Sequence, residues 1–490
     1  MTRADTPTRV SIGTLAGVVG FLAFVEFTSG VLQGYYTPML TNIARHLSIH
    51  DADVNWLEGT QLMLSALVVP AFAKLGDMIG HKRMLLISTA VTAAASFVLP
   101  FTASFAVFLV GWALMGFYVV WLPLEIALIW SRARRLEGRS TITARASGFL
   151  VAALESGAII GALAGGALVD VLPLWIVLLV PAVMIVICFF VVLFGVAESP
   201  EPTGGRFDTV GVVLISLALI AFTGGLSLLR LNGPGDVVSW LVVALGVVLV
   251  VPFALWELRQ DDPLIDVRMF RSPALGPVFL TAGLFGVSVL GAQAPLSTFA
   301  RTDPAVYGYG LGTSGFATSL IIGVYLIAMI TGALLYPLAS RLTAPRIALI
   351  VAALLVGVGF LMFLPLHETY LQVIVNMVVV GIGSGALVAA LPAAAASAAA
   401  HTQTGVATGL TNSVKTVGGA IASCVFGIAL LHGTAGAAAE GTAGSFAGYV
   451  TVWVVCGVTA LAAAALLLVV PKTAFSDRAM HPVTEVEPIA

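Results

Sequence analysis

Three carboxylic acids stand inside long apolar stretches of this sequence, where an ionisable group is costly. They are Glu26, Glu125 and Glu155, and Lys415 is the one cation that lies as deep in such a stretch. A charge at the centre of a membrane helix costs ~2.5–3.5 kcal/mol on insertion scales, so each of these groups is a functional candidate. A carboxyl group in a low-dielectric cavity can exchange protons or attract cations.

Glu26 lies on a polar stripe. Ser29, Gly30 and Gln33 follow it at spacings of three, four and seven residues, so the four residues share one helix face. Lipid would not tolerate this stripe, and we expect it to face the protein interior. We therefore interpret Glu26 as a proton carrier.

Glu125 shares a helix face with two aromatic residues, Tyr118 and Trp121. A carboxylate beside aromatic rings suits a lipophilic cation, so we expect a substrate site there. The alternative is an acid that snorkels to the end of its helix. Further polar candidates for substrate contact are Gln33, Gln293 and Asn376.

We assign Glu155 and Lys415 to proton coupling together with Glu26. Two alternatives stay open. Glu155 could make a hydrogen bond between helices, and Lys415 could make a structural bond to a backbone carbonyl group.

Apolar helices must position these groups. Of the 490 residues, 59% are hydrophobic and only 9% are charged, whereas about a quarter of the residues of a soluble chain are charged. A helix that crosses the ~30 Å hydrocarbon layer needs about 20 apolar residues. We predict an all-α membrane protein with 14 spans, at residues 14–36, 55–75, 84–103, 106–130, 144–168, 173–196, 209–229, 237–256, 275–299, 316–339, 346–365, 370–396, 405–431 and 448–470.

The cations predict the orientation of these spans. With the N-terminus in the cytoplasm, 18 of the 22 Lys and Arg residues fall on cytoplasmic segments, and Arg45, Arg230 and Arg301 fall outside. Short cytoplasmic loops carry such an excess of positive charge. We therefore expect a multi-pass protein of the cell (inner) membrane with both termini in the cytoplasm.

Two polar connections divide the chain. The stretch A-E-S-P-E-P-T-G-G-R-F-D, from Ala197 to Asp208, reads as a linker after the sixth span. A second charged connection, residues 257–273, follows the eighth span. We expect a six-helix half at 1–196, a linker with two additional helices at 197–274 and a second six-helix half at 275–490. Transporters built from two such halves bind their substrates between them.

Two short motifs bear on conformational change. In A-K-L-G-D-M-I-G-H-K-R, Asp77 and Gly80 are followed by Lys82 and Arg83, and an acid at this place could latch the inner face by accepting hydrogen bonds from a helix N-terminus. The alternative is a basic loop that only sets topology. In G-A-I-I-G-A-L-A-G-G, glycines recur every four residues and form a smooth face for close helix contact, with or without a role in coupling. These glycines are Gly157, Gly161, Gly165 and Gly166.

These motifs resemble the signature loop and the antiporter glycine motif of the major facilitator superfamily. The segments R-F-D-T-V-G, P-L-I-D-V-R-M-F and T-G-V-A-T-G-L-T-N-S-V-K-T-V-G-G are similar to its fourteen-span drug:proton antiporter family. The resemblance implies a first-span acid at Glu26 and a basic position at Lys415. The chain departs from the family at Trp112, where an intramembrane arginine is usual, and at Ala162, where a proline is usual.

Other function classes lack support in the sequence. The net charge of −2 gives no basic field for nucleic acid, and Cys188, Cys424 and Cys456 are not spaced as metal ligands. No G-x-x-x-x-G-K-[ST] loop for ATP occurs. We expect no enzymatic activity, cofactor or metal.

We predict a monomeric, proton-coupled multidrug exporter in the lipid bilayer, with lipophilic and cationic small molecules as substrates and antibiotic resistance as a consequence. The alternatives are a proton-coupled importer on the same fold, and a lipid-handling accessory protein without a transport cycle.

Overall fold

A computed structural model describes residues 12–132, 139–198, 207–260, 263–399, 404–432 and 442–469. All regular elements in these ranges are helices. Most of the linker predicted at 197–208 lies outside the described residues, as do several of the arginines that predict the orientation.

Helices α1 to α8 form the first part of the bundle. They are α1 (Ile12–Tyr35), α2 (Leu40–His46), α3 (Val54–Ile79), α4 (His81–Val98), α5 (Phe105–Met115), α6 (Trp121–Arg132), α7 (Arg139–Val169) and α8 (Leu174–Gly195). Three-residue 3-10 turns η1 (Thr37–Met39) and η2 (Asp51–Asp53) flank α2, η3 (Leu99–Phe101) follows α4, and η4 (Gly116–Val120) joins α5 to α6.

The remaining helices follow in chain order. They are α9 (Thr209–Asn232), α10 (Val237–Glu257), the 3-10 turn η6 (Val267–Arg271), α11 (Gly276–Val289), α12 (Gln293–Arg301), α13 (Pro304–Tyr307), α14 (Gly315–Leu342), α15 (Pro345–Leu361), α16 (Tyr370–Ala398), α17 (Thr404–His432) and α18 (Phe446–Leu467).

Among the described residues, 13 helical stretches are long and apolar enough to cross a membrane. The eleventh predicted span, 346–365, is the one that is missing from these 13, and it corresponds to α15, which has 17 residues. Hydrogen-bonded turns extend the chain from α15 to Leu366. The all-α membrane fold is therefore confirmed, with one span shorter than the sequence predicts.

Two predicted spans are interrupted, and the first is followed by a further helix. The first span ends at Tyr35, next to its predicted end, and the chain continues through a 3-10 turn that contains Pro38 into α2. The fourth changes to 3-10 geometry from Gly116 to Val120, and the ninth breaks between Val289 and Gln293. Apolar runs predict length but not such breaks, because packing and local glycine or proline content decide them.

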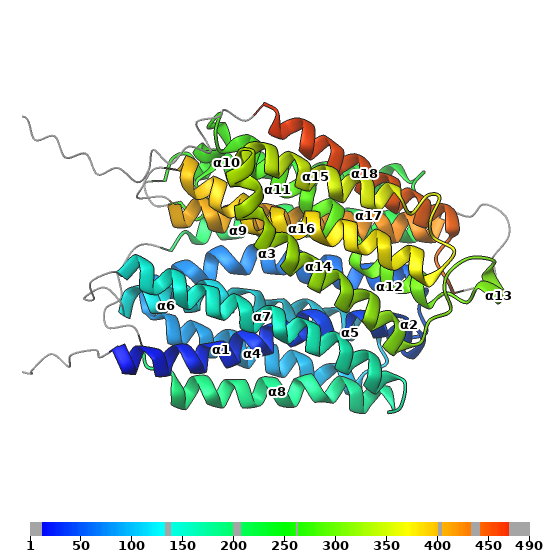
Figure 1. Cartoon of the computed structure of the whole chain (residues 1–490), viewed down its shortest axis with the longest axis horizontal. Coiled ribbons are helices and arrows are strands. Elements are labelled where there is room, and N and C mark those ends of the chain that lie inside the picture. The colour runs from blue at the N-terminus through cyan, green and yellow to red at the C-terminus, as the bar shows by residue number, and fades with distance from the viewer. Residues whose placement is uncertain are drawn as a thin grey trace, which may run out of the picture.

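Buried side chains gather in two main cores. The N-terminal core takes almost all its residues from α1 to α8, between Val18 and Val196. The C-terminal core takes almost all of its residues from the segment between Met269 and Leu467. Figure 1 shows the two groups of helices side by side, blue to teal below and green to red above.

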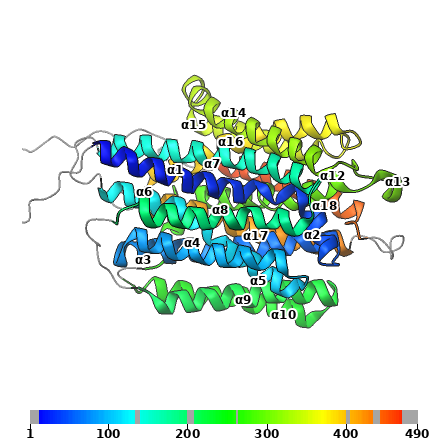
Figure 2. The same cartoon turned by 90° about the horizontal axis from the view of Figure 1, so that it is seen from below.

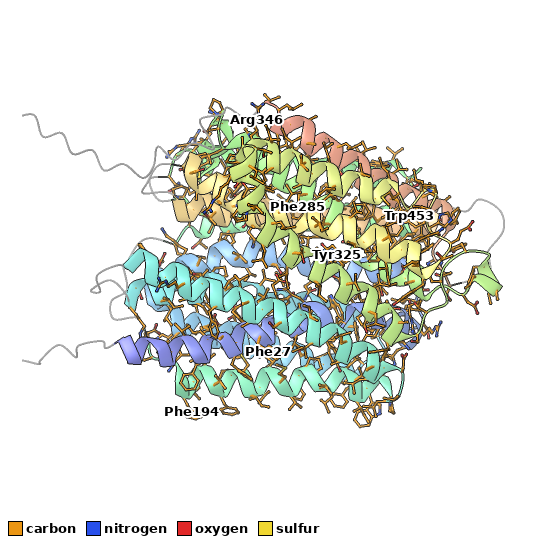
Figure 3. All side chains as sticks on the ribbon, viewed as in Figure 1. Phe27, Phe194, Phe285, Tyr325, Arg346 and Trp453 are labelled. Atoms are coloured by element: carbon orange, nitrogen blue, oxygen red, sulfur yellow. The ribbon has the colours of Figure 1, made fainter. Side chains whose placement is uncertain are left out.

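The two cores meet mainly through two helix pairs, α7 with α14 and α3 with α17. We call the end of the bundle at which α1 begins and α3 ends the proximal end, and the end at which α3 and α14 begin the distal end. In Figure 3, Tyr325 and Phe285 belong to the C-terminal core, whereas Phe194 is 81% exposed on the outer surface.

Helices α9 and α10 pack against each other at one edge of the bundle (Figure 2). Leu226 and Leu229 of α9 form a small cluster with Trp56 of α3 and Cys424 of α17. Arg230 Nε donates to Asp53 Oδ1 over 2.6 Å. The additional pair therefore contacts both cores.

Candidate functional site

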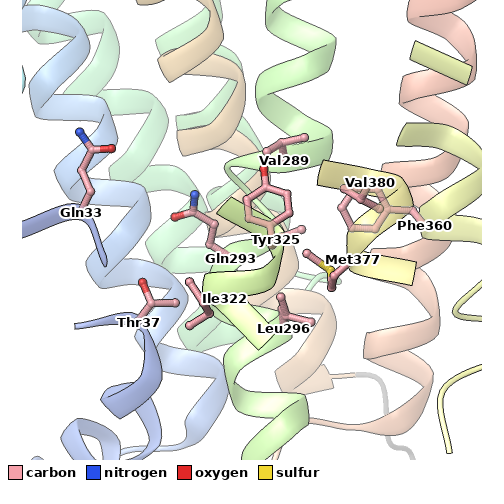
Figure 4. Close-up of a pocket in the computed structure, with 11 residues that line it drawn as sticks. Gln33, Thr37, Val289, Gln293, Leu296, Ile322, Tyr325, Phe360, Met377 and Val380 are labelled. Carbon is pink, nitrogen blue, oxygen red and sulfur yellow. The ribbon is translucent and has the colours of Figure 1, made fainter. Parts of the chain in front are cut away.

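A cavity with an empty volume of about 540 Å³, open solvent included, lies between the two cores (Figure 4). Gln33 and Thr37 line it from the N-terminal core, and Gln293 and Tyr325 line it from α12 and α14. The remaining lining is apolar. The two amides come from different cores, and neither makes a hydrogen bond to another described residue, so both are free to bind a ligand.

A second cavity lies within the C-terminal core, between α11, α16 and α17. Its apolar wall includes Phe285 and Leu391, and its polar groups are Thr411, Asn412 and Lys415. Lys415 is the charged residue of this wall. It is partly buried, and no described residue accepts a hydrogen bond from its ammonium group.

Glu155 belongs to α7 of the N-terminal core and lines neither cavity. It is partly exposed, and it interacts electrostatically with Lys415 of the second cavity and with Tyr325 of the first. The structure gives Glu155 and Lys415 no hydrogen bond or ion pair with each other. An acid and a base from different cores are thus near enough to interact but do not pair directly.

Glu26 and Glu125 lie inside the N-terminal core. Both side chains are 0% exposed, and all four carboxyl oxygens lack a hydrogen-bond partner among the described residues. The two carboxyl groups interact electrostatically with each other, and Cys188 of α8 interacts with both. A buried carboxylate without a donor is costly, whereas a protonated one is far less so. This pair has the environment of a proton-binding site.

The other predicted substrate contacts lie inside the cores. The rings of Tyr118 and Trp121 meet edge to face, with centroids 6.2 Å apart, and both side chains are buried. Asn376 is fully buried and donates from Nδ2 to the Leu366 carbonyl over 2.7 Å. Of the predicted substrate residues, the structure brings Gln33 and Gln293 to the first cavity. Neither cavity is lined by the other four, which are Tyr118, Trp121, Glu125 and Asn376.

Sequence reasoning missed an acid. Glu58 of α3 is partly buried and interacts electrostatically with Tyr118. Asn55, Gln61 and Ser65 lie three residues before it and three and seven after it. This is the same kind of polar stripe that singles out Glu26, so the signal was present in the sequence.

Trp112 occupies the position at which the resembling family has an arginine. Its indole stacks on Phe108 and meets the ring of Tyr36 at a centroid distance of 5.0 Å. The indole nitrogen is buried without a hydrogen-bond partner among the described residues. Aromatic packing therefore fills this position.

The predicted latch residues lie at the proximal end. Asp77 Oδ1 is 3.2 Å from His81 Nε2. The carboxylate that accepts hydrogen bonds from the N-terminus of α4 belongs to Glu198, with Lys82 N at 2.9 Å and Arg83 N at 3.1 Å. Gly80 joins the two helices with φ at +113°, a conformation that favours glycine.

The glycine run of α7 faces two helices. A Cβ atom at Gly157 would lie 2.1 Å from the Phe27 carbonyl oxygen of α1, and one at Gly165 would lie 2.1 Å from that of Tyr35. At Gly161 a Cβ would meet the backbone of Val31, and at Gly166 it would meet Gly315 O of α14 at 2.5 Å. No side chain larger than hydrogen fits there without moving a helix.

The distal end joins the cores by polar contacts. Asp170, just after α7, accepts hydrogen bonds from Gly315 N and Phe316 N, both at 2.9 Å. Arg301 Nη2 donates to Asn42 Oδ1 over 2.8 Å. Among pairs of described residues, the hydrogen bonds that cross between the two cores lie at this end.

Comparison with known proteins gives one family. The model described as "Major Facilitator Superfamily" matches residues 22–423. Similar curated proteins include the cephamycin export protein CmcT of Amycolatopsis lactamdurans, 27% identical over 96% of this chain and 95% of that protein. The tetracenomycin C resistance and export protein of Streptomyces glaucescens is 26% identical over 77% of this chain and 69% of its own length.

Other similarities are of the same kind. The multidrug efflux pump LfrA of Mycolicibacterium smegmatis is 26% identical over 75% of this chain and 71% of that protein. Among solved structures, an auto-inhibited POT family peptide transporter superposes with a TM-score of 0.65 and 17% identity, covering 97% of this chain and 99% of that one. The nucleoside transporter NupG gives 0.63 and 12%, covering 93% and 98%. The two structures establish the fold alone.

Proposed function

This chain belongs to the major facilitator superfamily, and from that premise we propose that it exports lipophilic small molecules, cations among them, in exchange for protons. It is a multi-pass membrane transporter and not an enzyme. Export is favoured because the similar curated proteins are described as export or efflux proteins. The cation bias of the predicted loops supports an inner-membrane protein whose proximal end and both termini are cytoplasmic. The proposal also takes the protein to act as a monomer.

The observation that carries the proton proposal is the Glu26–Glu125 pair. Two fully buried carboxyl groups that receive no hydrogen bond from a described residue, inside the moving part of a transporter, cannot both carry charge at low cost. Proton binding and release at this pair would couple the pH gradient to the arrangement of α1 and α6. Trp112 supplies no charge there, and in this proposal the pair holds the proton.

Cation selectivity has a related physical basis. Glu26, Glu58, Glu125 and Glu155 lie at membrane depth in the N-terminal core, whereas Lys415 lies in the other core. Such an excess of acid attracts cations. When α6 exposes Glu125 beside Tyr118 and Trp121, a cationic substrate can replace the proton, so that proton and substrate compete for neighbouring carboxyl groups. Gln33, Gln293 and Asn376 serve as polar contacts for the body of the substrate.

The moving bodies in this proposal are the two halves, 1–196 and 275–490, with 197–274 as linker and additional helices. Asp77, Gly80, Lys82 and Arg83 act with Glu198 as the proximal latch. The glycines of α7 allow it to slide against α1 and α14 at close range.

A transport assay tests this proposal. We expect a lipophilic cation, tetraphenylphosphonium, to release protons from acid-loaded proteoliposomes that contain the full chain. Glu26→Gln should abolish this release. The matched control is Glu368→Gln, because Glu368 is exposed. Protons that move with the substrate would indicate import, and the absence of proton movement with any drug tested would contradict the proposal.

A further inference from the structure

Among the described residues, Lys415 and Glu155 have no charged partner within ion-pair distance. Lys415 lies in the wall of the second cavity with the Asn412 amide beside it. Its ammonium group has no hydrogen bond to any residue in the described ranges. An ammonium group away from water and without a counter-charge is destabilising by several kcal/mol.

Glu155 carries the complementary charge on the other core. It comes from α7, which packs on α1 and α14, whereas Lys415 comes from α17, which packs on α3 and α11. The two interact electrostatically without reaching hydrogen-bond distance. Two helices from different cores therefore hold an acid and a base near each other without direct pairing.

The cavities beside these charges have apolar walls. Phe285 and Leu391 line the cavity at Lys415, and Tyr325, which interacts with Glu155, lines the first cavity with Phe360 and other apolar residues. A ligand that satisfied both charges would need an apolar body between an anionic and a cationic group. A ligand with a positive charge alone would leave Lys415 without a partner.

We propose that Glu155 and Lys415 form a split subsite for zwitterionic substrates, in which the carboxylate of the substrate binds Lys415 and Asn412 and its ammonium group binds Glu155. This inference rests on the proposed export function and names a substrate class for it. Zwitterions are favoured over cations of the same size because they alone pair both side chains. The Asn412 amide can donate to the carboxylate, which adds to the selectivity for that group.

A matched series of ligands tests the subsite. The dipeptide Phe-Phe is a zwitterion, its methyl ester a cation, its N-acetyl derivative an anion, and its N-acetyl methyl ester neutral. Binding to the purified full-length protein is measured for all four by calorimetry. We expect the wild-type protein to bind the zwitterion about tenfold more tightly than the ester, which is the scale of one charge-assisted hydrogen bond.

The variants separate the two charges. Lys415→Gln should weaken binding of the zwitterion and the anion about tenfold and leave the ester unchanged, and Lys415→Arg should restore most of the loss. Glu155→Gln should weaken the zwitterion and the ester and spare the anion. Arg271→Gln is the control, because Arg271 is an exposed cation outside both cavities.

Two outcomes overturn the subsite. One is a loss in Lys415→Gln that is equal for all four ligands, which would indicate a gate or a structural role. The other is equal binding of the neutral and zwitterionic ligands to the wild-type protein. Proton release driven by tetraphenylphosphonium distinguishes the two proposals. If protons are released but the zwitterion is not preferred, the subsite alone is contradicted. If the zwitterion is preferred but no ligand releases protons, the export function alone is contradicted.

Discussion

Asp170 of the N-terminal core caps the first turn of α14 in the C-terminal core, with its Oδ1 atom 2.9 Å from Gly315 N. Its Oδ2 atom accepts from Phe316 N, and Arg301 Nη1 approaches Oδ1 at 3.8 Å. One carboxylate thus satisfies two N–H groups of a helix that belongs to the opposite core. In an alternating-access cycle this contact must break when the distal end opens.

We expect Asp170→Ala to favour opening of the distal end, because it removes the acceptor for both N–H groups. The loss of a cap costs about 1 kcal/mol, which shifts a conformational equilibrium roughly fivefold. Thr37→Cys, in a background without the three native cysteines, reports the change as faster reaction with a membrane-impermeant maleimide.

The control for this prediction is Asp303→Ala. Asp303 accepts from Ala305 N at 2.9 Å, so it caps a helical turn within its own core. Equal acceleration in both variants would show that loosening of the distal loops, and not the contact between the cores, governs access.

The glycine face of α7 gives a prediction about packing. Gly161→Leu should prevent normal folding or lock one state, because even a Cβ atom at this position would lie 2.8 Å from the Val31 backbone of α1. Gly148→Leu in the same helix should be tolerated, since no atom lies within 4 Å of a Cβ there. Size-exclusion profiles and thermal unfolding of the purified variants measure the difference. Normal folding and transport by Gly161→Leu would contradict close contact.

The sequence predicts the fold well because a membrane span is a local property. About 20 apolar residues identify a span without knowledge of its neighbours. The charge bias of the loops then predicts the orientation of the spans. Helix breaks at Gly116 and after Val289 escaped prediction because they depend on packing against other helices. The short α15 escaped for a related reason, since its apolar run continues into turns that are not α-helical.

The site was harder to predict because it depends on which helix faces meet. The stripe around Glu26 indicates an inward face, and Glu26 is indeed buried. Two further relationships involve residues far apart in the chain: Glu26 interacts with Glu125, and Glu155 interacts with Lys415. The spacing of residues along one helix cannot predict such pairs. Glu58 differs, because its stripe was visible in the sequence.

The proximal latch gives a prediction about two acids. Asp77→Asn should abolish transport while membrane insertion stays normal, because it removes the charge beside His81. Glu198→Gln should have a similar effect, since Glu198 bridges Lys82 and Arg83 of α4 to the end of α8. Uptake of a fluorescent cation into inverted vesicles measures transport, and immunoblots of membranes measure insertion. Wild-type transport by Asp77→Asn would contradict its role in the latch.

The roles of Glu26 and Glu125 can be separated although the two groups interact. Glu26→Gln keeps the shape of the side chain but cannot exchange a proton, so it should abolish transport driven by a pH gradient and leave substrate binding measurable. Glu125→Gln should weaken binding of cationic substrates by ~1–2 kcal/mol, the scale of a desolvated cation beside aromatic rings, and spare neutral ones.

Because the Glu26 and Glu125 carboxyl groups are neighbours, the effects of the two substitutions should not be additive in the double variant. Binding of one cationic and one neutral drug across a pH series, in both single variants and in the double variant, measures this. Proton exchange that persists in Glu26→Gln, or an equal loss for both drugs in Glu125→Gln, would show that the proton and the cation are held elsewhere.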